Sequence, residues 1–174
     1  MSLSRTTYRV VLFASLTWSL AIIAPPIAFH FGATGLADFI YGFFSRVCHQ
    51  LESHSLHLFG AKLAVCARCT AIYLGFFVSV VLYPLLMRRI LTTVVARTIS
   101  GSSRTLFLSV LPILLALGLS EIGVHESTLV TRVVTGAILG ITLPFILMSP
   151  ADEAMKELRL SLRPSFIGRI RHAK

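Results

Sequence analysis

Four apolar segments, each long enough to cross a lipid bilayer, restrict the fold of this chain more than any other feature of its sequence. A spanning helix needs roughly 20 apolar residues, because the hydrocarbon core is about 30 Å thick and a helix rises about 1.5 Å per residue. Charged residues make up only 13% of the 174 residues, whereas about a quarter is usual in soluble domains. We therefore expect an all-α integral membrane protein with transmembrane helices over about residues 10–31, 67–87, 106–123 and 129–148.

The first apolar segment is expected to stay in the protein as a span. Arg5 and Arg9 precede it as they would precede a signal peptide, but the run is long for one and no small-x-small cleavage site follows. Pro25-Pro26 removes backbone donors, so we expect the regular helix to kink or end there. We expect one transmembrane domain over residues 1–150 and a basic cytoplasmic tail over residues 151–174.

A short amphipathic helix is expected between the first two spans, just before the first cysteine. Asp38, Ser45 and Arg46 fall there between apolar residues that recur at helical spacing: Leu36, Phe39, Ile40, Phe43, Phe44 and Val47. Such a helix lies in the membrane interface or packs on the helix bundle.

The distribution of basic residues predicts the orientation of the chain in the membrane. They are concentrated before the first span, between the second and third, and after the fourth, for example Arg5, Arg88, Arg104, Lys156 and Arg171. The positive-inside rule therefore places both termini in the cytoplasm and the cysteines outside, in the cytoplasmic (inner) membrane of a bacterium or archaeon. The basic residues that give the net charge of +9 then face anionic lipid headgroups. Because they follow the membrane topology, we expect no nucleic-acid binding.

The three cysteines of the chain gather where the second span begins. Cys48 is followed by His49, and Cys66 and Cys69 form a Cys-x-x-Cys pair that surrounds Arg68. Three thiolates and one imidazole make a tetrahedral set that favours zinc, although copper(I) and iron accept the same ligands. With four protein ligands the metal is structural, whereas three leave a position open for Lewis-acid chemistry.

Two other interpretations of the cysteines stay open at the level of sequence. Cys66 and Cys69 can exchange with a disulfide, with Cys48 as a relay thiol, since a helix N-terminus and Arg68 both lower a thiol pKa. They can equally form a plain disulfide or be inert buried residues. His54, His57 and Glu52 are alternative ligands, partners of ligands or simply interfacial polar residues; Gln50 is a partner of a histidine or a substrate, or a loop residue.

Charged residues also occur near the outer ends of the last two spans. Arg132 lies within an apolar run, and Glu121 is its most natural partner. On the predicted topology both share the membrane face of the cysteines, so Glu121, Arg132 and Arg68 are candidate catalytic residues. The alternative for Arg132 is a side chain that extends to the headgroups. Gly136 and Gly140 give the fourth span a small-residue face that predicts close helix contact, within the bundle or in a dimer, and we favour contact within the bundle.

These motifs resemble the signature of a family of small prokaryotic membrane proteins that is catalogued as a domain of unknown function. The resemblance covers roughly residues 40 to 145 and rests on Cys48-His49-Gln50, Ser55, the run from Cys66 to Gly75, Glu121, Ser127-Thr128, Arg132, Gly136 and Gly140. Ala71 and Glu52 depart from it, where glycine and proline are usual. The resemblance implies a multi-helix membrane protein with a Cys/His site and supplies no activity.

The sequence therefore predicts a membrane protein that binds a metal, most simply zinc, through Cys48, His49, Cys66 and Cys69 at its external face. It acts as an accessory subunit of a larger membrane complex or as a metal-dependent enzyme on a lipid-soluble substrate. The alternatives are a membrane thiol–disulfide oxidoreductase and a metal-handling or transport protein. The spans lack a line of polar residues through the bilayer, which counts against transport.

Overall fold

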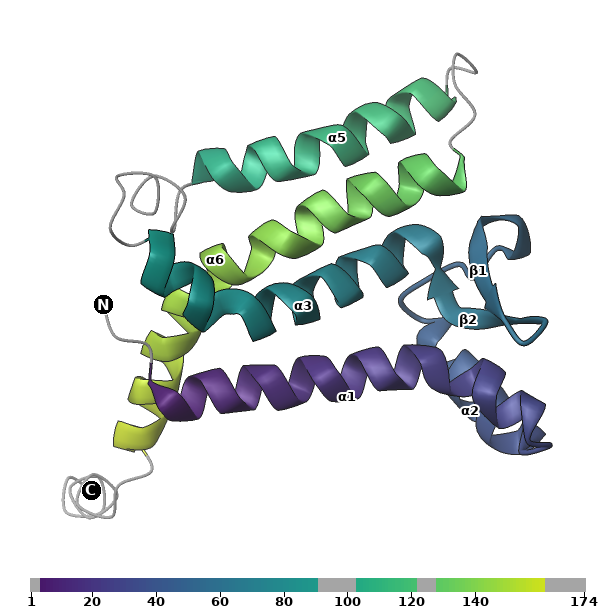
Figure 1. Ribbon diagram of the computed structural model, residues 1–174, viewed down its shortest axis with the longest axis horizontal. Helices are drawn as coiled ribbons and strands as arrows, with labels where there is room; N and C mark the ends of the chain where they lie inside the picture. The colour runs from purple at the N-terminus through teal and green to yellow at the C-terminus, as the bar shows by residue number, and fades with distance from the viewer. Residues whose placement is uncertain (1–3, 91–102, 122–127, 162–174) are drawn as a thin grey trace, which may run out of the picture.

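The computed structural model describes residues 4–90, 103–121 and 128–161 of the chain. Its long helices lie side by side in a bundle in which α1 and α5 run in one direction and α3 and α6 in the other (Figure 1). A short helix and a two-stranded hairpin are inserted between the first two long helices. The elements in chain order are α1 (Arg5–His30), α2 (Thr34–Phe44), a 3-10 turn (Glu52–His54), β1 (Ser55–Leu58), β2 (Ala61–Cys66), α3 (Ala67–Ile90), α5 (Ser103–Glu121) and α6 (Leu129–Ser161).

The bundle has α3 and α6 at its centre. These two helices make the most extensive contact of any pair, α1 packs against α3, and α5 packs against α6 (Figure 1). The hairpin and α2 lie together at one end, whereas the start of α1 and the end of α6 lie at the other. Each long helix therefore runs from one end of the bundle to the other, and the first and last described helices have their outer termini at the same end.

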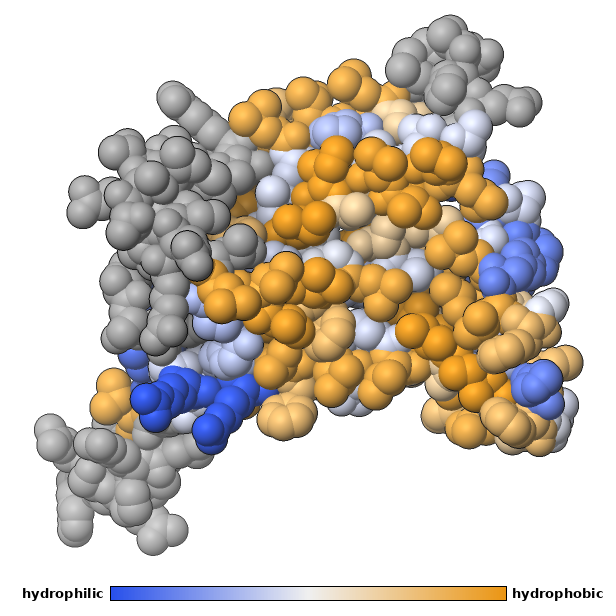
Figure 2. Space-filling view, viewed as in Figure 1, coloured by the Kyte–Doolittle hydropathy of each residue, from blue (hydrophilic) through white to orange (hydrophobic). Residues whose placement is uncertain are grey.

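Three helices of the described part are long and apolar enough to span a membrane: Arg5–His30, Ala67–Leu85 and Leu129–Met148. They match the first, second and fourth predicted spans, whereas α5 has a shorter apolar stretch, Leu106–Ala116. Apolar residues cover the long helices in Figure 2, and hydrophilic residues gather at the two ends. This distribution suits a bundle whose middle lies in hydrocarbon.

Two helices continue through prolines. α1 remains an α-helix through Pro25 and Pro26 to His30, so the helix does not end at the prolines. α6 continues through Pro144 and Pro150 to Ser161, so the expected domain boundary at residue 150 falls within a helix. Residues 162–174 of the predicted tail lie outside the described residues.

The β-hairpin corrects the expectation that every element is helical. β1 and β2 pair antiparallel, with His57 opposite Lys62 and Leu58 opposite Ala61. The turn residues Phe59 and Gly60 both have positive φ, 52° and 79°. This is the backbone of a tight primed turn, whose twist matches that of the flanking strands. The hairpin brings the end of β2, and with it Cys66, back to the start of α3.

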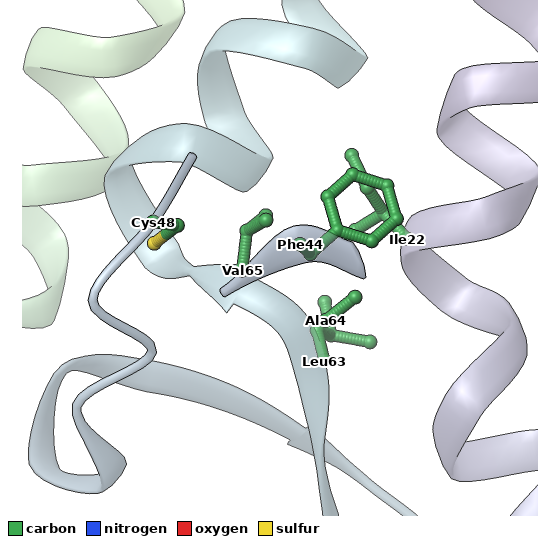
Figure 3. Close-up of a cluster of buried hydrophobic side chains, with 6 residues drawn as sticks. All are labelled: Ile22, Phe44, Cys48, Leu63, Ala64 and Val65. Carbon is green, nitrogen blue, oxygen red and sulfur yellow. The ribbon is translucent and has the colours of Figure 1, made fainter. Parts of the chain in front are cut away.

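A buried cluster joins α1, α2 and the hairpin, and it contains the first cysteine. Its members are Ile22, Phe44, Cys48, Leu63, Ala64 and Val65. In Figure 3 the Phe44 ring lies against Ile22, and Val65 lies between this pair and Cys48. Trp18 of α1 packs edge-on against Phe44, with ring centres 5.2 Å apart. The cluster fixes α2, which was expected as the amphipathic helix, against α1.

Glycines of α6 allow its close contact with α3, as the small-residue pattern predicts. A Cβ atom on Gly136 would lie 2.4 Å from the carbonyl oxygen of Arg68, and one on Gly140 would lie 2.3 Å from that of Ile72. Any larger residue would force the two backbones apart. The first turn of α3, which carries Cys69 and directly follows Cys66, is therefore set directly against α6.

Candidate metal centre

The three cysteines meet at the hairpin end of the bundle, although they come from separate pieces of chain. Cys48 follows α2, Cys66 is the last residue of β2, and Cys69 lies in the first turn of α3. Their sulfur atoms all lie within 4.8 Å of one another. Cys48 is 8% exposed and the other two are half-buried, so the cluster is largely shielded.

Local hydrogen bonds hold the three thiols together. The backbone N–H of Cys48 donates to the carbonyl of Phe44 at 3.0 Å, which continues the last turn of α2. The backbone N–H of Cys66 donates to Sγ of Cys48 at 3.2 Å. This second bond connects the loop after α2 to the end of β2. The backbone of Cys66 therefore holds the thiol of Cys48 in place.

The Cys66 thiol lies where α3 begins, and its pKa is lowered to about 5. The chief cause is the hydrogen bond from the Cys69 thiol; the backbone N–H groups of Cys69 and Arg68 and the Cys48 thiol add to it, against the effect of burial. Helix N-termini stabilise thiolates in this way. All three cysteines are free, so none of them is held in a disulfide.

The structure does not bring His49 into this group. Its side chain is exposed, and within the described residues only Cys48, Cys66 and Cys69 form a metal-capable cluster. Adjacent residues of a chain point in different directions, so the burial of Cys48 does not carry its neighbour inward. The four-ligand set expected from the sequence is thus present as three thiols with the imidazole outside.

Gln50 has a structural contact that the sequence did not reveal. Its side-chain amide donates to the carbonyl of Tyr41 at 2.9 Å and to that of Ala64 at 2.7 Å. The Tyr41 hydroxyl in turn donates to the carbonyl of Lys62, and the Lys62 ammonium donates to the carbonyl of Gln50. This network ties α2, which precedes Cys48, to β2, which ends at Cys66.

The histidines after the first cysteine contact charged side chains. Nε2 of His54 lies 3.3 Å from Nη2 of Arg132, and Nε2 of His57 lies 2.8 Å from Oε1 of Glu52. Glu52 also pairs with Lys62, and these hydrogen bonds, that of His57 first, lower the pKa of its carboxyl. Neither histidine belongs to the thiol cluster.

The structure describes the side chains of two of the three candidate catalytic residues, Arg68 and Arg132. Arg68 is buried in the first turn of α3, next to the cysteine pair. Arg132 is half-buried on α6 and reaches His54. Glu121 is the last residue of α5, but its side chain lies outside the described residues. The expected pairing of Glu121 with Arg132 therefore stays a prediction.

The thiol cluster fits a metal ion of the expected kind. A zinc–sulfur bond is about 2.3 Å long, so tetrahedral geometry separates two bound sulfurs by about 3.8 Å. The sulfur atoms, all within 4.8 Å of one another, need to move little to reach that separation. The described fold and site thus define a helical membrane protein with a group of three cysteines at one end that could bind a metal.

The comparisons with known proteins give the family. Residues 48–146 match the family described as "Predicted membrane protein (DUF2085)", and the chain belongs to this family. It is also similar to the uncharacterized protein MJ1492 of Methanocaldococcus jannaschii, with 30% identity over 146 residues, which cover 81% of this chain and 90% of that protein. No solved structure matches the chain. The matched region begins at Cys48 and so includes all three cysteines.

Proposed function

We propose that this membrane protein binds one transition-metal ion, most simply zinc, through the thiolates of Cys48, Cys66 and Cys69. The observation that carries the proposal is the convergence of three sulfur atoms within 4.8 Å from a loop, a strand and a helix. Copper(I) and iron accept the same thiolate ligands, and metal analysis decides among the three metals. A bound zinc ion supplies Lewis-acid chemistry and activates a bound water.

The fourth ligand decides whether the metal is structural or reactive. His49 remains the candidate that the sequence offers, because it directly follows Cys48. Its exposed side chain favours instead three protein ligands and a position open to water or substrate. Catalytic zinc sites keep such a position, whereas structural sites use four protein ligands. We therefore favour a metal-dependent enzyme over an accessory subunit of a larger complex.

An apolar pocket beside the buried cluster supports a lipid-soluble substrate. It has a volume of about 630 Å³ and lies between α1 and α2. Trp18 and Phe44 line it and also belong to the packing around Cys48. A hydrocarbon chain can enter such a pocket from the bilayer without crossing water.

The proposed placement has four spans, with α5 as the third, in the cytoplasmic (inner) membrane of a bacterium or archaeon. The thiol cluster then faces outward, and both termini face the cytoplasm and its anionic lipids. Arg5 and Arg9 at the start of α1 and Lys156 near the end of α6 support this orientation, because basic residues favour the cytoplasmic side.

Metal analysis of the full chain, purified in an uncharged detergent without chelator, tests the proposal. We expect about one equivalent of zinc in the natural protein and a loss of most of it in Cys48→Ser and in Cys69→Ser. Ser45→Ala, an exposed change three residues before Cys48, should keep the metal. Retention of metal by His49→Ala would indicate an open fourth position. A metal-free natural protein, or metal that survives both cysteine changes, would refute the proposal.

A thiol–disulfide oxidoreductase is the second candidate, and the lowered pKa of Cys66 favours it. A thiol with a pKa near 5 is largely thiolate at neutral pH and attacks disulfides readily. In that case Cys66 and Cys69 would be isolated as a mixture of thiol and disulfide. Mass spectrometry after rapid alkylation distinguishes this mixture from three protected, metal-bound thiolates.

A further inference from the structure

The Arg68 side chain is the most unusual buried group of the described residues. Arg68 is 9% exposed, and its Nε and Nη2 atoms are buried with no hydrogen-bond partner among the described residues. The ion pairs within the described part of the chain join Glu52 to His57 and Lys62, and Asp152 to Lys156, so none of them includes Arg68. Two buried N–H-bearing atoms of a guanidinium that lack an acceptor are costly, and proteins rarely retain such groups unless something binds them.

The thiol cluster does not satisfy these donors, although Arg68 lies between Cys66 and Cys69 in the chain. None of the three sulfur atoms accepts a hydrogen bond from Nε or Nη2 of Arg68. The guanidinium and the thiols are therefore neighbouring, separate features of the same end of the bundle. An acceptor for Arg68 has to come from another source.

A second arginine approaches from the opposite helix. Arg132 lies on α6 one turn before Gly136, whose Cα faces the carbonyl of Arg68 across the helix contact. His54, which contacts Nη2 of Arg132, adds a third nitrogen-bearing side chain. Both arginines place positive charge where the start of α3 meets α6, and positive charge gathered in one region favours the binding of an anion.

We propose that Arg68, assisted by Arg132, binds an oxyanion of the phosphate class beside the thiol cluster. The planar guanidinium offers a fork of N–H donors that matches two phosphate oxygens. The N-terminal end of α3 adds partial positive charge at the same place. That the phosphate is part of a substrate rests on the proposed function. That an anion binds at this place rests on the buried guanidinium of Arg68. The phosphate belongs to a lipid headgroup or is free in solution.

Thermal unfolding of the full chain in dodecyl maltoside tests the site with inorganic phosphate as the probe. We expect phosphate to raise the Tm in a saturable manner, compared with chloride at equal ionic strength. Arg68→Gln should weaken the apparent affinity roughly tenfold to a hundredfold, the usual effect of losing a charged hydrogen bond. Arg46→Gln is the matched control, because Arg46 is exposed at the same end of the bundle. Equal phosphate affinity in Arg68→Gln and the natural protein would overturn the proposal.

A second arm separates the two sources of phosphate. The full chain is placed in phosphatidylcholine nanodiscs with or without phosphatidylglycerol. Stabilisation by inorganic phosphate alone identifies a free anion, whereas stabilisation only by phosphatidylglycerol identifies a lipid headgroup; either result supports the site if Arg68→Gln abolishes it. Stabilisation by neither, or by an amount that Arg68→Gln leaves unchanged, overturns it.

Two readouts keep the test decisive if Arg68→Gln does not fold. Arg68→Lys, which keeps a positive charge at the same place, should still be stabilised by phosphate or phosphatidylglycerol, with a weaker apparent affinity than the natural protein. An affinity of Arg68→Lys equal to that of the natural protein would refute the role of the guanidinium. Metal content, measured on the same samples, reports the thiol cluster independently: Cys48→Ser that loses metal and still binds phosphate through Arg68 separates the two claims.

Discussion

At the scale of single residues, the thiol cluster depends on side chains that cannot bind metal themselves. The side-chain amide of Gln50 donates to the carbonyl of Tyr41 in α2, before the loop that carries Cys48, and to that of Ala64 in β2, after it. Gln50 itself has a positive φ of 50°, which non-glycine residues adopt only where their surroundings hold them. The side-chain hydrogen bonds and the backbone conformation of Gln50 together hold Cys48, two residues earlier, in place.

Replacing Gln50 should therefore loosen the cluster without removing a ligand. In Gln50→Ala the buried carbonyl of Ala64 loses its 2.7 Å partner. We expect a loss of about 1–3 kcal/mol in stability, the usual effect of leaving a buried acceptor unsatisfied. Thermal unfolding measures the loss, and faster alkylation of Cys48 reports the loosening. Ser53→Ala, an exposed change nearby, serves as control; an equal effect of the two changes would contradict this role of Gln50.

The residue scale also shows where sequence reasoning reaches its limit. The clustering of Cys48, Cys66 and Cys69 was predictable, because the Cys-x-x-Cys spacing and a single remaining cysteine leave few arrangements. The exposure of His49 was not, because the conformation of an irregular loop decides which of two adjacent residues points inward. The contacts of Gln50 join residues 9 and 14 positions away and have no local pattern.

At the scale of elements, apolar length and helical spacing predicted most of the helices. The α2 helix and the start of α3 at Ala67 agree closely with the expected segments. The hairpin was missed because its strands are only four and six residues long and lie beside polar residues. The alternation Ser55-Leu56-His57-Leu58, followed by Gly60, was the available signal. Tertiary contact with α1 stabilises strands too short to persist alone.

The contact between α3 and α6 gives the element-scale prediction. In Gly136→Ala the new methyl group meets the carbonyl oxygen of Arg68 at 2.4 Å, so the first turn of α3 has to move. We expect a loss of about 1–3 kcal/mol in stability and a reduced metal content, because that turn carries Cys69. Thermal unfolding and metal analysis of one preparation measure both effects.

Gly118→Ala is the matched control for this change. Gly118 also lies within a long helix, but an added Cβ there meets no atom of the described residues within 4 Å. Its Tm should stay unchanged or rise slightly, since alanine favours a helix by up to about 1 kcal/mol over glycine. If Gly136→Ala were as stable as Gly118→Ala, the close packing of the two helices would not be what positions the cysteine pair.

At the scale of the whole molecule, Asp152 joins the last described helix, α6, to the start of the first, α1. Its carboxylate accepts hydrogen bonds from the Ser4 backbone N–H at 3.0 Å and the Thr7 hydroxyl at 2.9 Å, and it pairs with Lys156 at 2.7 Å. These contacts, that of Lys156 first, hold its pKa below the ordinary value of 3.8. They fix the start of α1 to the end of α6, away from the thiol cluster.

The lowered pKa of Asp152 makes this junction sensitive to acid. The stabilisation is fully present above the unfolded-state pKa of 3.8 and is lost as the pH falls through the lower folded-state pKa. We expect Asp152→Asn to have a lower Tm than the natural protein at neutral pH, and the difference to shrink below about pH 4. Glu153→Gln, an exposed neighbour, should show no such difference. A gap between Asp152→Asn and the natural protein that widens in acid would contradict the assignment.

The central claim is that three cysteines of one chain bind a metal at one end of a membrane bundle, and the number of sulfur ligands tests it most directly. X-ray absorption spectroscopy of the natural protein, purified without chelator, counts the atoms bound to the metal and identifies sulfur by its bond length. The account predicts three sulfur atoms at about 2.3 Å and one lighter atom. A metal bound only by nitrogen and oxygen would contradict it.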